Sequence, residues 1–161
     1  MASLEVKIIL SCVFLIYANV IAAQSKQLQC PEAKPQAHIE ASNDKEVSCQ
    51  AWTVIKDWEV DNTFSHLVGG MNYSDGQLIV PKAGAYYIYA QLYFHSKGRV
   101  FMMKNNEAVT LVQHPNSEEG LQFTAGVFFL RAGDVISMKT RDSLKMYMFS
   151  YHTYFGAFLI Q

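Results

Sequence analysis

Residues 76–94 read GQLIVPKAGAYYIYAQLYF, and this stretch decides the fold class of the chain. A brief strand over 77–80 is stopped by Pro81, because proline donates no hydrogen bond to a sheet. A turn at 83–84 then leads into a longer strand. That strand, 85–94, is rich in tyrosine and branched aliphatic residues, which favour pleated sheets. We therefore expect two consecutive strands joined by a tight turn.

Alternation inside 85–94 indicates that both faces of this strand need burial. One face holds Tyr86, Ile88, Ala90, Leu92 and Phe94, and the other holds Tyr87, Tyr89, Gln91 and Tyr93. The last strand behaves alike, with Phe155, Ala157 and Leu159 on one face and Tyr154, Phe158 and Ile160 on the other. One face packs in the core of the domain. A partner subunit is the simplest cover for the second face.

The rest of the chain continues the pattern of short strands separated by turns. A turn cluster is expected at 72–76, and no stretch shows the spacing of an amphipathic helix. Many short strands without helices predict an all-β sandwich or jelly roll. Further strands are expected at 37–41, 52–55, 99–103, 108–113, 121–130, 135–140 and 153–160.

The N-terminus resembles a targeting segment. Lys7 precedes an apolar run over 8–23, which ends in small residues before a polar stretch. The run is short for a spanning helix, so residues 1–23 are expected to be a secretory signal peptide, with an uncleaved type II membrane anchor as the alternative. Residues 24–34 form a short polar tether, and 35–161 form one domain. Either alternative exports the domain.

The three cysteines predict few cross-links. Cys12 lies in the apolar run and would leave with it, whereas Cys30 and Cys49 remain. In an oxidising compartment this pair would form a disulfide or link chains, and two unpaired thiols are the alternative. Two cysteines are too few for a disulfide scaffold, so the fold must depend on its core.

Asn72-Tyr73-Ser74 is an N-glycosylation sequon within the expected turn cluster. In an exported chain we expect Asn72 to carry a glycan.

Four segments in order resemble tumour necrosis factor ligands. The stretch 76–94 resembles the family's signature of a short strand, a turn with glycine and a strand of the form Gly-x-Tyr-x-Ile-Tyr-x-Gln-x-x-Phe. PQAHI at 35–39 resembles the opening of that domain, FTAGVFFLRAGD at 123–134 its sixth strand and turn, and TYFGAFLI at 153–160 its closing strand. The resemblance covers 35–161 and implies a jelly-roll β-sandwich that assembles as a homotrimer.

Within that family the chain looks most similar to the ectodysplasin, TWEAK and B-cell-activating-factor group. The pair Trp58-Glu59 and the Thr-Ala-Gly at 124–126 carry this likeness. The chain departs from the group because it lacks a pair of cysteines in the fifth and sixth strands. It also lacks the axial cysteine with which one family member holds zinc, so no metal or other cofactor is expected.

The resemblance implies positions for the subunit interface. Several of these positions belong to the faces that alternation already marks as needing a second cover. The implied interface residues are Tyr87, Tyr89, Phe123, Tyr154, Phe158 and Ile160.

The family's receptors are cysteine-rich and bind in the groove between neighbouring subunits. A hairpin there often bears an exposed aromatic residue or leucine, and the nearest match in this chain is Leu111 within Thr110-Leu111-Val112. Leu111 is therefore a candidate receptor contact. The alternative is that it is an ordinary core residue of a strand.

Other classes of function find little support. The formal net charge is −1 without any block of Lys or Arg, so a nucleic-acid partner is not expected. No two of the five histidines lie within five residues of each other, and no nucleophile motif or phosphate-binding loop occurs, so an enzyme of the cupin kind is disfavoured. His38 is interpreted as a packed or hydrogen-bonded residue. A complement-head-like binding module is the main alternative function, although the collagen tract typical of that class is missing.

Overall fold

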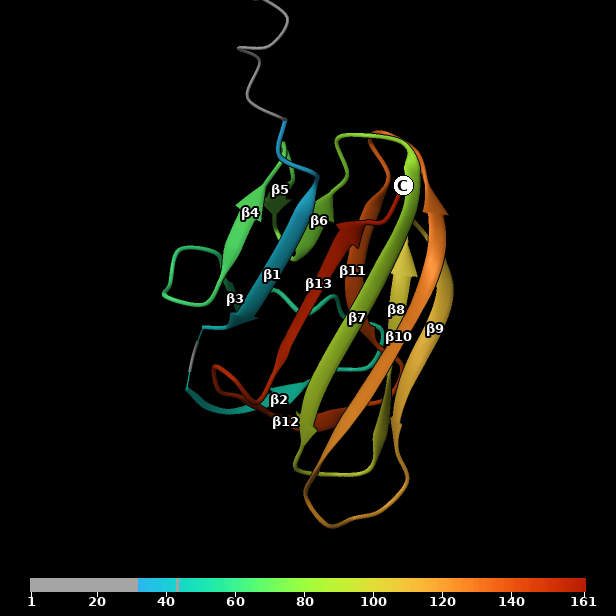
Figure 1. Ribbon diagram of the computed structural model, residues 1–161. Helices are drawn as coiled ribbons and strands as arrows, with labels where there is room; N and C mark the ends of the chain where they lie inside the picture. Colours follow the sequence, from blue (N-terminus) through green and yellow to red (C-terminus); the bar gives the residue numbers. More distant parts are fainter. Residues whose placement is uncertain (1–31, 43) are drawn as a thin grey trace, which may run out of the picture. The chain divides into compact units, whose positions relative to one another are not determined.

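Two antiparallel β-sheets pack face to face in the computed structural model, which describes residues 32–42 and 44–161 (Figure 1). Within these ranges the secondary structure is entirely strands and turns. No helix long and apolar enough to cross a membrane occurs in the described residues. The expected signal or anchor segment 1–23 lies outside them, as do residues 24–31 of the expected tether.

The larger sheet has eight strands, and β7 lies at its centre. Its strands run in the order β2-β12-β7-β13-β1-β3, while β10 also pairs with β7 and β4 with β1. The bounds are β1 (Gln36–Ala41), β2 (Lys45–Cys49), β3 (Trp58–Glu59), β4 (His66–Val68), β7 (Gly84–Phe94), β10 (Gly120–Leu130), β12 (Leu144–Met148) and β13 (Tyr154–Leu159).

The smaller sheet has five strands in the order β5-β6-β11-β8-β9. Its bounds are β5 (Asn72–Ser74), β6 (Gln77–Ile79), β8 (Gly98–Lys104), β9 (Glu107–His114) and β11 (Val135–Thr140). Chain reversals at Asp75-Gly76 and Asn105 use residues with positive φ, which glycine, asparagine and aspartate adopt at low cost.

The core lies between the sheets and contains the face of β7 that alternation predicted. Tyr86, Ile88, Ala90, Leu92 and Phe94 are all fully buried. From the closing strand, Phe155 is also fully buried and packs edge-on against Trp58 at a ring distance of 4.7 Å. The Tyr86 hydroxyl donates a 2.8 Å hydrogen bond to the carbonyl of Lys82, so its polar end is satisfied. These burials confirm the predicted core face.

Strand register then fixes what lies on the opposite, outer face. All eleven residues of β7 pair with β10, from Gly84 opposite Leu130 to Phe94 opposite Gly120. On its other side, β7 pairs with β13, which places Phe158 opposite Tyr87. Side chains alternate across each strand, so the odd-numbered residues of β7 and β10 and the even-numbered residues of β13 share the outer face.

The structure differs from the sequence-based expectation at several short elements. Residues 52–55 were expected to form a strand, but Trp52 lies in a turn and only Val54 makes an isolated bridge, to Lys139. Trp52 has a φ of 61°, which a strand residue does not adopt. The turn expected over 72–76 is a strand at β5 followed by a turn. Strands β2, β3, β4 and β12 were not expected from the sequence.

Candidate functional site

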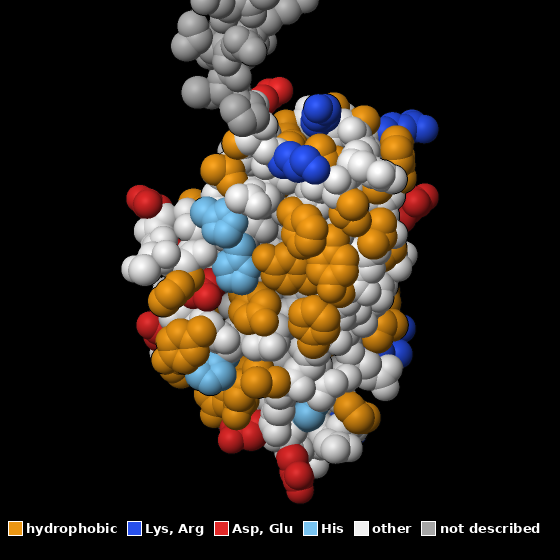
Figure 2. All heavy atoms as spheres, viewed as in Figure 1, with side chains coloured by type: hydrophobic (Ala, Val, Ile, Leu, Met, Phe, Trp, Pro, Cys, Tyr) orange, Lys and Arg blue, Asp and Glu red, His pale blue; other side chains and the backbone are white. Residues whose placement is uncertain are grey.

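The face of the larger sheet that points away from the core carries a continuous apolar surface. We call this face the outer face. Figure 2 shows hydrophobic side chains gathered over β7, β13 and β10, with histidines beside them on the side of β1. Among the outer-face positions of β1, β7, β10 and β13, Glu40 is the only Asp, Glu, Lys or Arg. A surface of this kind is typical of a protein–protein contact.

Strand β10 exposes an apolar row, which is not the pattern expected for an isolated domain. Its outer row is apolar, with Phe123 and Val127 each 58% exposed and Phe129 65% exposed. Its inner row contains polar residues beside the apolar Phe128 and Leu130. Gln122 lies 3.2 Å from His114 of β9, and the hydroxyls of Thr124 and Thr110 are 3.3 Å apart. The strand is therefore built to place its apolar side chains against something outside the domain.

The rings on β7 and β13 form one aromatic layer. The ring of Tyr87 lies 5.3 Å from that of Phe158 and 6.1 Å from that of Tyr89. The ring of Tyr89 meets that of Tyr154 edge-on at 6.3 Å. These spacings lie within the range of favourable aromatic pairs, so the layer is ordered before any partner binds.

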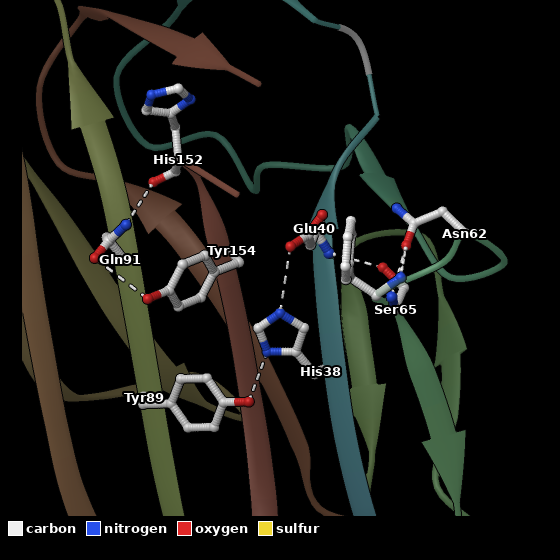
Figure 3. A network of polar contacts seen from close by, with 9 residues as sticks. His38, Glu40, Asn62, Ser65, Tyr89, Gln91, His152 and Tyr154 are labelled. Atoms are coloured by element: carbon white, nitrogen blue, oxygen red, sulfur yellow. Dashed lines mark hydrogen bonds and ion pairs between the residues drawn. The ribbon is translucent and has the colours of Figure 1, made fainter. Parts of the chain in front are cut away.

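A glycine allows Tyr89 to lie across β13. Gly156 is the register partner of Tyr89, and a Cβ atom at this position would lie 2.5 Å from the Tyr89 hydroxyl oxygen. That contact is too short for any real side chain. Because Gly156 has no side chain, the Tyr89 ring crosses β13 and its hydroxyl lies 2.7 Å from Nδ1 of His38 on β1 (Figure 3).

The surroundings of His38 and Tyr89 favour one direction for their hydrogen bond. Burial raises the pKa of Tyr89 to about 12, with the nearby Tyr154 and Tyr87 hydroxyls adding to the effect, so its hydroxyl keeps its proton and is able to donate. Burial also lowers the pKa of His38, against the opposing charge of Glu40. A neutral His38 accepts at Nδ1 and carries its proton on Nε2, which lies 3.6 Å from a carboxylate oxygen of Glu40. The predicted hydrogen-bonded role of His38 is thus confirmed.

Other polar groups on the outer face pair within the face itself. Tyr154 donates to the side-chain oxygen of Gln91, whose amide donates to the carbonyl of His152, both at 3.2 Å (Figure 3). Glu40 is buried, and one of its carboxylate oxygens has no hydrogen-bond partner among the described residues. Apart from that oxygen, these groups would remain satisfied if a partner covered the outer face.

Besides its tyrosines, the outer face has two ionisable side chains on β1, His38 and Glu40. They lie 3.6 Å apart, and the His38 ring lies 5.0 Å from that of Tyr154. Among the residues that the structure describes, no group of three or more His, Cys, Asp or Glu is placed to hold a metal ion.

Comparison with known proteins agrees with this geometry. The model of the TNF (Tumour Necrosis Factor) family matches residues 56–115. The chain carries a tumour necrosis factor family domain. Domains of this family are cytokine ligands and not enzymes. No curated protein sequence matches the chain at a significant level.

Solved structures of the family share the tumour necrosis factor fold with this chain. Eiger TNF from S. frugiperda has a TM-score of 0.67 at 16% identity. The match covers 80% of this chain and 94% of the Eiger chain. Murine APRIL at pH 8.5 has a TM-score of 0.63 at 21% identity, with coverage of 80% and 100%. At such identities the likeness shows the fold alone, and the resemblance to the ectodysplasin, TWEAK and B-cell-activating-factor group stays a prediction.

The structure brings together the six residues that the tumour necrosis factor resemblance assigned to the subunit interface. All six lie on the outer face, from three strands and the residue that follows β13; the role assigned to them stays a prediction. They are the half-buried Tyr87, Tyr89 and Tyr154 and the exposed Phe123, Phe158 and Ile160.

The candidate receptor residue of this tumour necrosis factor domain lies elsewhere. Leu111 is in the middle of β9, on the smaller sheet, where it pairs with Phe101 of β8. It is 40% exposed, so it is not an ordinary core residue. Trp52 approaches the Phe101 ring at 6.2 Å, and together the three side chains form a small apolar cluster.

Two further residues with predicted modifications, Asn72 and Cys49, lie on strands of the domain. Asn72 is exposed in β5, so a glycan there would meet no buried structure. Cys49 is half-buried at the end of β2, and burial raises the pKa of its thiol. Cys30 lies outside the described residues, so the disulfide between this pair stays a prediction.

Sequence reasoning found one residue of the β10 outer row and missed the others. The residues missed are Leu121, Val127 and Phe129. Their two-residue spacing with Phe123 was visible as a signal. However, Phe128 and Leu130 are apolar on the opposite face, so alternation alone did not identify the row that points away from the core.

Proposed function

We propose that this protein is an extracellular cytokine that forms a homotrimer through the outer face and clusters cysteine-rich receptors of the tumour necrosis factor receptor type, in immune or developmental signalling. The observation that carries the proposal is the apolar row of β10. Phe123, Val127 and Phe129 are exposed in the isolated subunit, whereas polar residues of the same strand point inward. A partner that covers this row would remove a large apolar area from water.

A second copy of the chain fits that surface by charge and by shape. The outer face is nearly free of charged side chains, so a similar surface from a neighbouring copy meets no repulsion. Flat aromatic layers bury much area with little loss of side-chain entropy. Closed rings of identical subunits are the usual way to cover such a surface on every copy.

Trimeric assembly would supply the signalling mechanism. A ring of three subunits presents three equivalent grooves, so one ligand gathers several receptors by avidity and needs no chemical step. Leu111 is proposed as a receptor contact because it is exposed and lies on the smaller sheet, away from the outer face. Assembly and receptor binding should therefore respond to different substitutions.

The route to the cell surface follows from the N-terminal segment. Ligands of this family are extracellular or type II membrane proteins, and residues 1–23 suit a cleaved signal peptide or, alternatively, an anchor. A membrane contact is proposed only for the anchored form. In the oxidising exterior, Asn72 would carry a glycan, and Cys30 and Cys49 would pair.

The test is binding of a panel of cysteine-rich receptor ectodomains to immobilised protein. The Leu111→Asp variant should keep the assembly state of the parent and weaken receptor binding by about tenfold, since a central apolar contact contributes about 1–2 kcal/mol. Leu111→Met is the matched control and should bind as the parent does. Unchanged binding by Leu111→Asp would remove this residue from the proposal. Failure of every ectodomain to bind the trimer would contradict the receptor class.

A further inference from the structure

Four aromatic rings line a pocket at the end of β7, where Tyr93 continues the outer-face row of that strand. Tyr93 comes from β7, Tyr147 from β12, and Phe149 and His152 from the loop that leads to β13. Together with Glu119, which lies just before β10, they line a cavity of about 340 Å³. None of the six residues predicted for the subunit interface lines this cavity, which we call the aromatic cage.

The rings of the aromatic cage form a closed circuit. Tyr93 and Tyr147 are 5.1 Å apart at 71°, and Tyr147 and Phe149 are 5.4 Å apart at 53°. Phe149 and His152 are 6.2 Å apart at 76°, and His152 returns to Tyr93 at 5.5 Å and 85°. Consecutive rings are thus steeply tilted relative to one another, and the pocket that they line is open to solvent.

A carboxylate stands at the rim of the aromatic cage. Glu119 lines it, and its carboxylate lies 3.3 Å from His95, which is also 3.3 Å from Glu46. The Glu46 charge is matched by Lys145 at 2.8 Å. The pKa values of Tyr93 and Tyr147 are raised, first by desolvation and then by the Glu119 charge, so both hydroxyls stay neutral.

We propose that the aromatic cage binds an organic cation that carries a quaternary ammonium group. Aromatic faces attract cations through the ring quadrupole, and cages of several rings select methylated ammonium groups. The Glu119 carboxylate adds an opposite charge at the rim, where a ligand cation keeps part of its hydration.

The arrangement favours a methylated ammonium over the other biological cations. A guanidinium group is flat and stacks best between parallel faces, whereas consecutive rings here are tilted by 53° to 85°. A primary ammonium needs acceptors for three N–H groups, and Glu119 is the only carboxylate that lines the cage. A trimethylammonium group has no N–H to satisfy, so it loses the least on leaving water.

The test uses choline and its neutral isostere 3,3-dimethyl-1-butanol as probes on residues 24–161. Ligand-observed NMR should show saturable choline binding with an upfield shift of its methyl signal and a dissociation constant of about 1 mM or below. The isostere should bind at least about tenfold more weakly, because it lacks the charge. Equal binding of both probes, or no saturation by about 20 mM choline, would overturn the proposal.

Substitutions identify the site of choline binding. Tyr147→Leu removes one ring and should weaken choline binding by about tenfold, whereas Tyr147→Phe keeps the ring and should retain it. Glu119→Gln should weaken binding several-fold, and Glu118→Gln, at the exposed neighbour, should not. If Glu119→Gln and Tyr147→Leu both fold and bind choline as the parent does, the aromatic cage is not the site. Flotation with phosphatidylcholine and phosphatidylglycerol vesicles distinguishes a lipid headgroup from a soluble ligand. Preferential binding to phosphatidylcholine vesicles would identify the ligand as a lipid headgroup. Binding of free choline without binding to either vesicle would identify it as a soluble cation.

Discussion

Replacing Phe123 by alanine should dissociate the assembly without destabilising the subunit. The side chain is 58% exposed in the isolated domain, so truncation leaves no cavity there. A phenylalanine buries roughly 200 Å² when it is fully covered, so about 120 Å² of this side chain is free to be covered by a neighbour. At about 25 cal/mol per Å², that area is worth about 3 kcal/mol for each subunit.

Three copies together make the effect large. The trimer would lose about 9 kcal/mol at full coverage, which is a factor of about 10⁶ to 10⁷ in its dissociation constant. The concentration at half-dissociation varies as the square root of that constant, so it should rise by about a thousandfold. Full coverage sets the upper limit of this effect, and a tenfold rise in the concentration at half-dissociation would still place Phe123 in the interface.

The assay is sedimentation velocity over a dilution series, with Phe64→Ala as the matched control. Phe64 is 61% exposed in the loop between β3 and β4 and belongs to none of β7, β10 and β13, so its loss should leave the midpoint unchanged. Thermal unfolding of both variants in the dissociated state should match the parent. Equal shifts for the two variants, or no shift for Phe123→Ala, would refute the assignment of the outer face.

Three further outcomes follow from the contacts described above. Phe155→Ala removes a fully buried ring and should lower the free energy of unfolding by about 3–5 kcal/mol in urea titrations, and a loss below about 1 kcal/mol would show that the core is wrongly assigned. Gly156→Ala places a Cβ 2.5 Å from the Tyr89 hydroxyl oxygen and should cost about 1–3 kcal/mol, read as a lower melting temperature; an unchanged value would contradict the close packing of Tyr89 over β13. The pKa of His38 is lowered by burial, so the unfolded chain binds more protons as pH falls below about 6.5, and the folded state loses stability from there down through the lowered pKa. Between pH 7.5 and 5.5 the parent should therefore lose more stability than His38→Gln, in which the remaining groups of the cluster (Glu40, His66, Tyr89 and Tyr154) are unchanged; equal losses would contradict the role of His38.

The central strands were predictable because their signals are local. In β7 the two-residue alternation of large apolar side chains and the flanking Pro81 and Gly84 define both the strand and its core face. Short strands such as β2, with the sequence KEVSC, carry no such signal, since their pairing with β12 depends on a partner nearly a hundred residues away. Trp52 has strand propensity, but its positive φ is imposed by the turn around it.

The candidate interface was predictable only in part for a similar reason. Alternation marked Tyr87 and Tyr89 because a single strand showed two apolar faces. The β10 row required knowledge of the register with β7, which only the folded chain provides. The aromatic cage was beyond sequence reasoning, because its five residues come from three distant segments, at 93, 119 and 147–152. Tyr93 and Tyr147 meet only through the pairing of β7 with β12.

The most direct measurement is the solution mass of residues 24–161, by light scattering on a sizing column. The proposed assembly through the outer face predicts three times the monomer mass at micromolar concentration. A folded monomer at that concentration would contradict the central claim, because the exposed row of β10 would then have no partner copy to cover it.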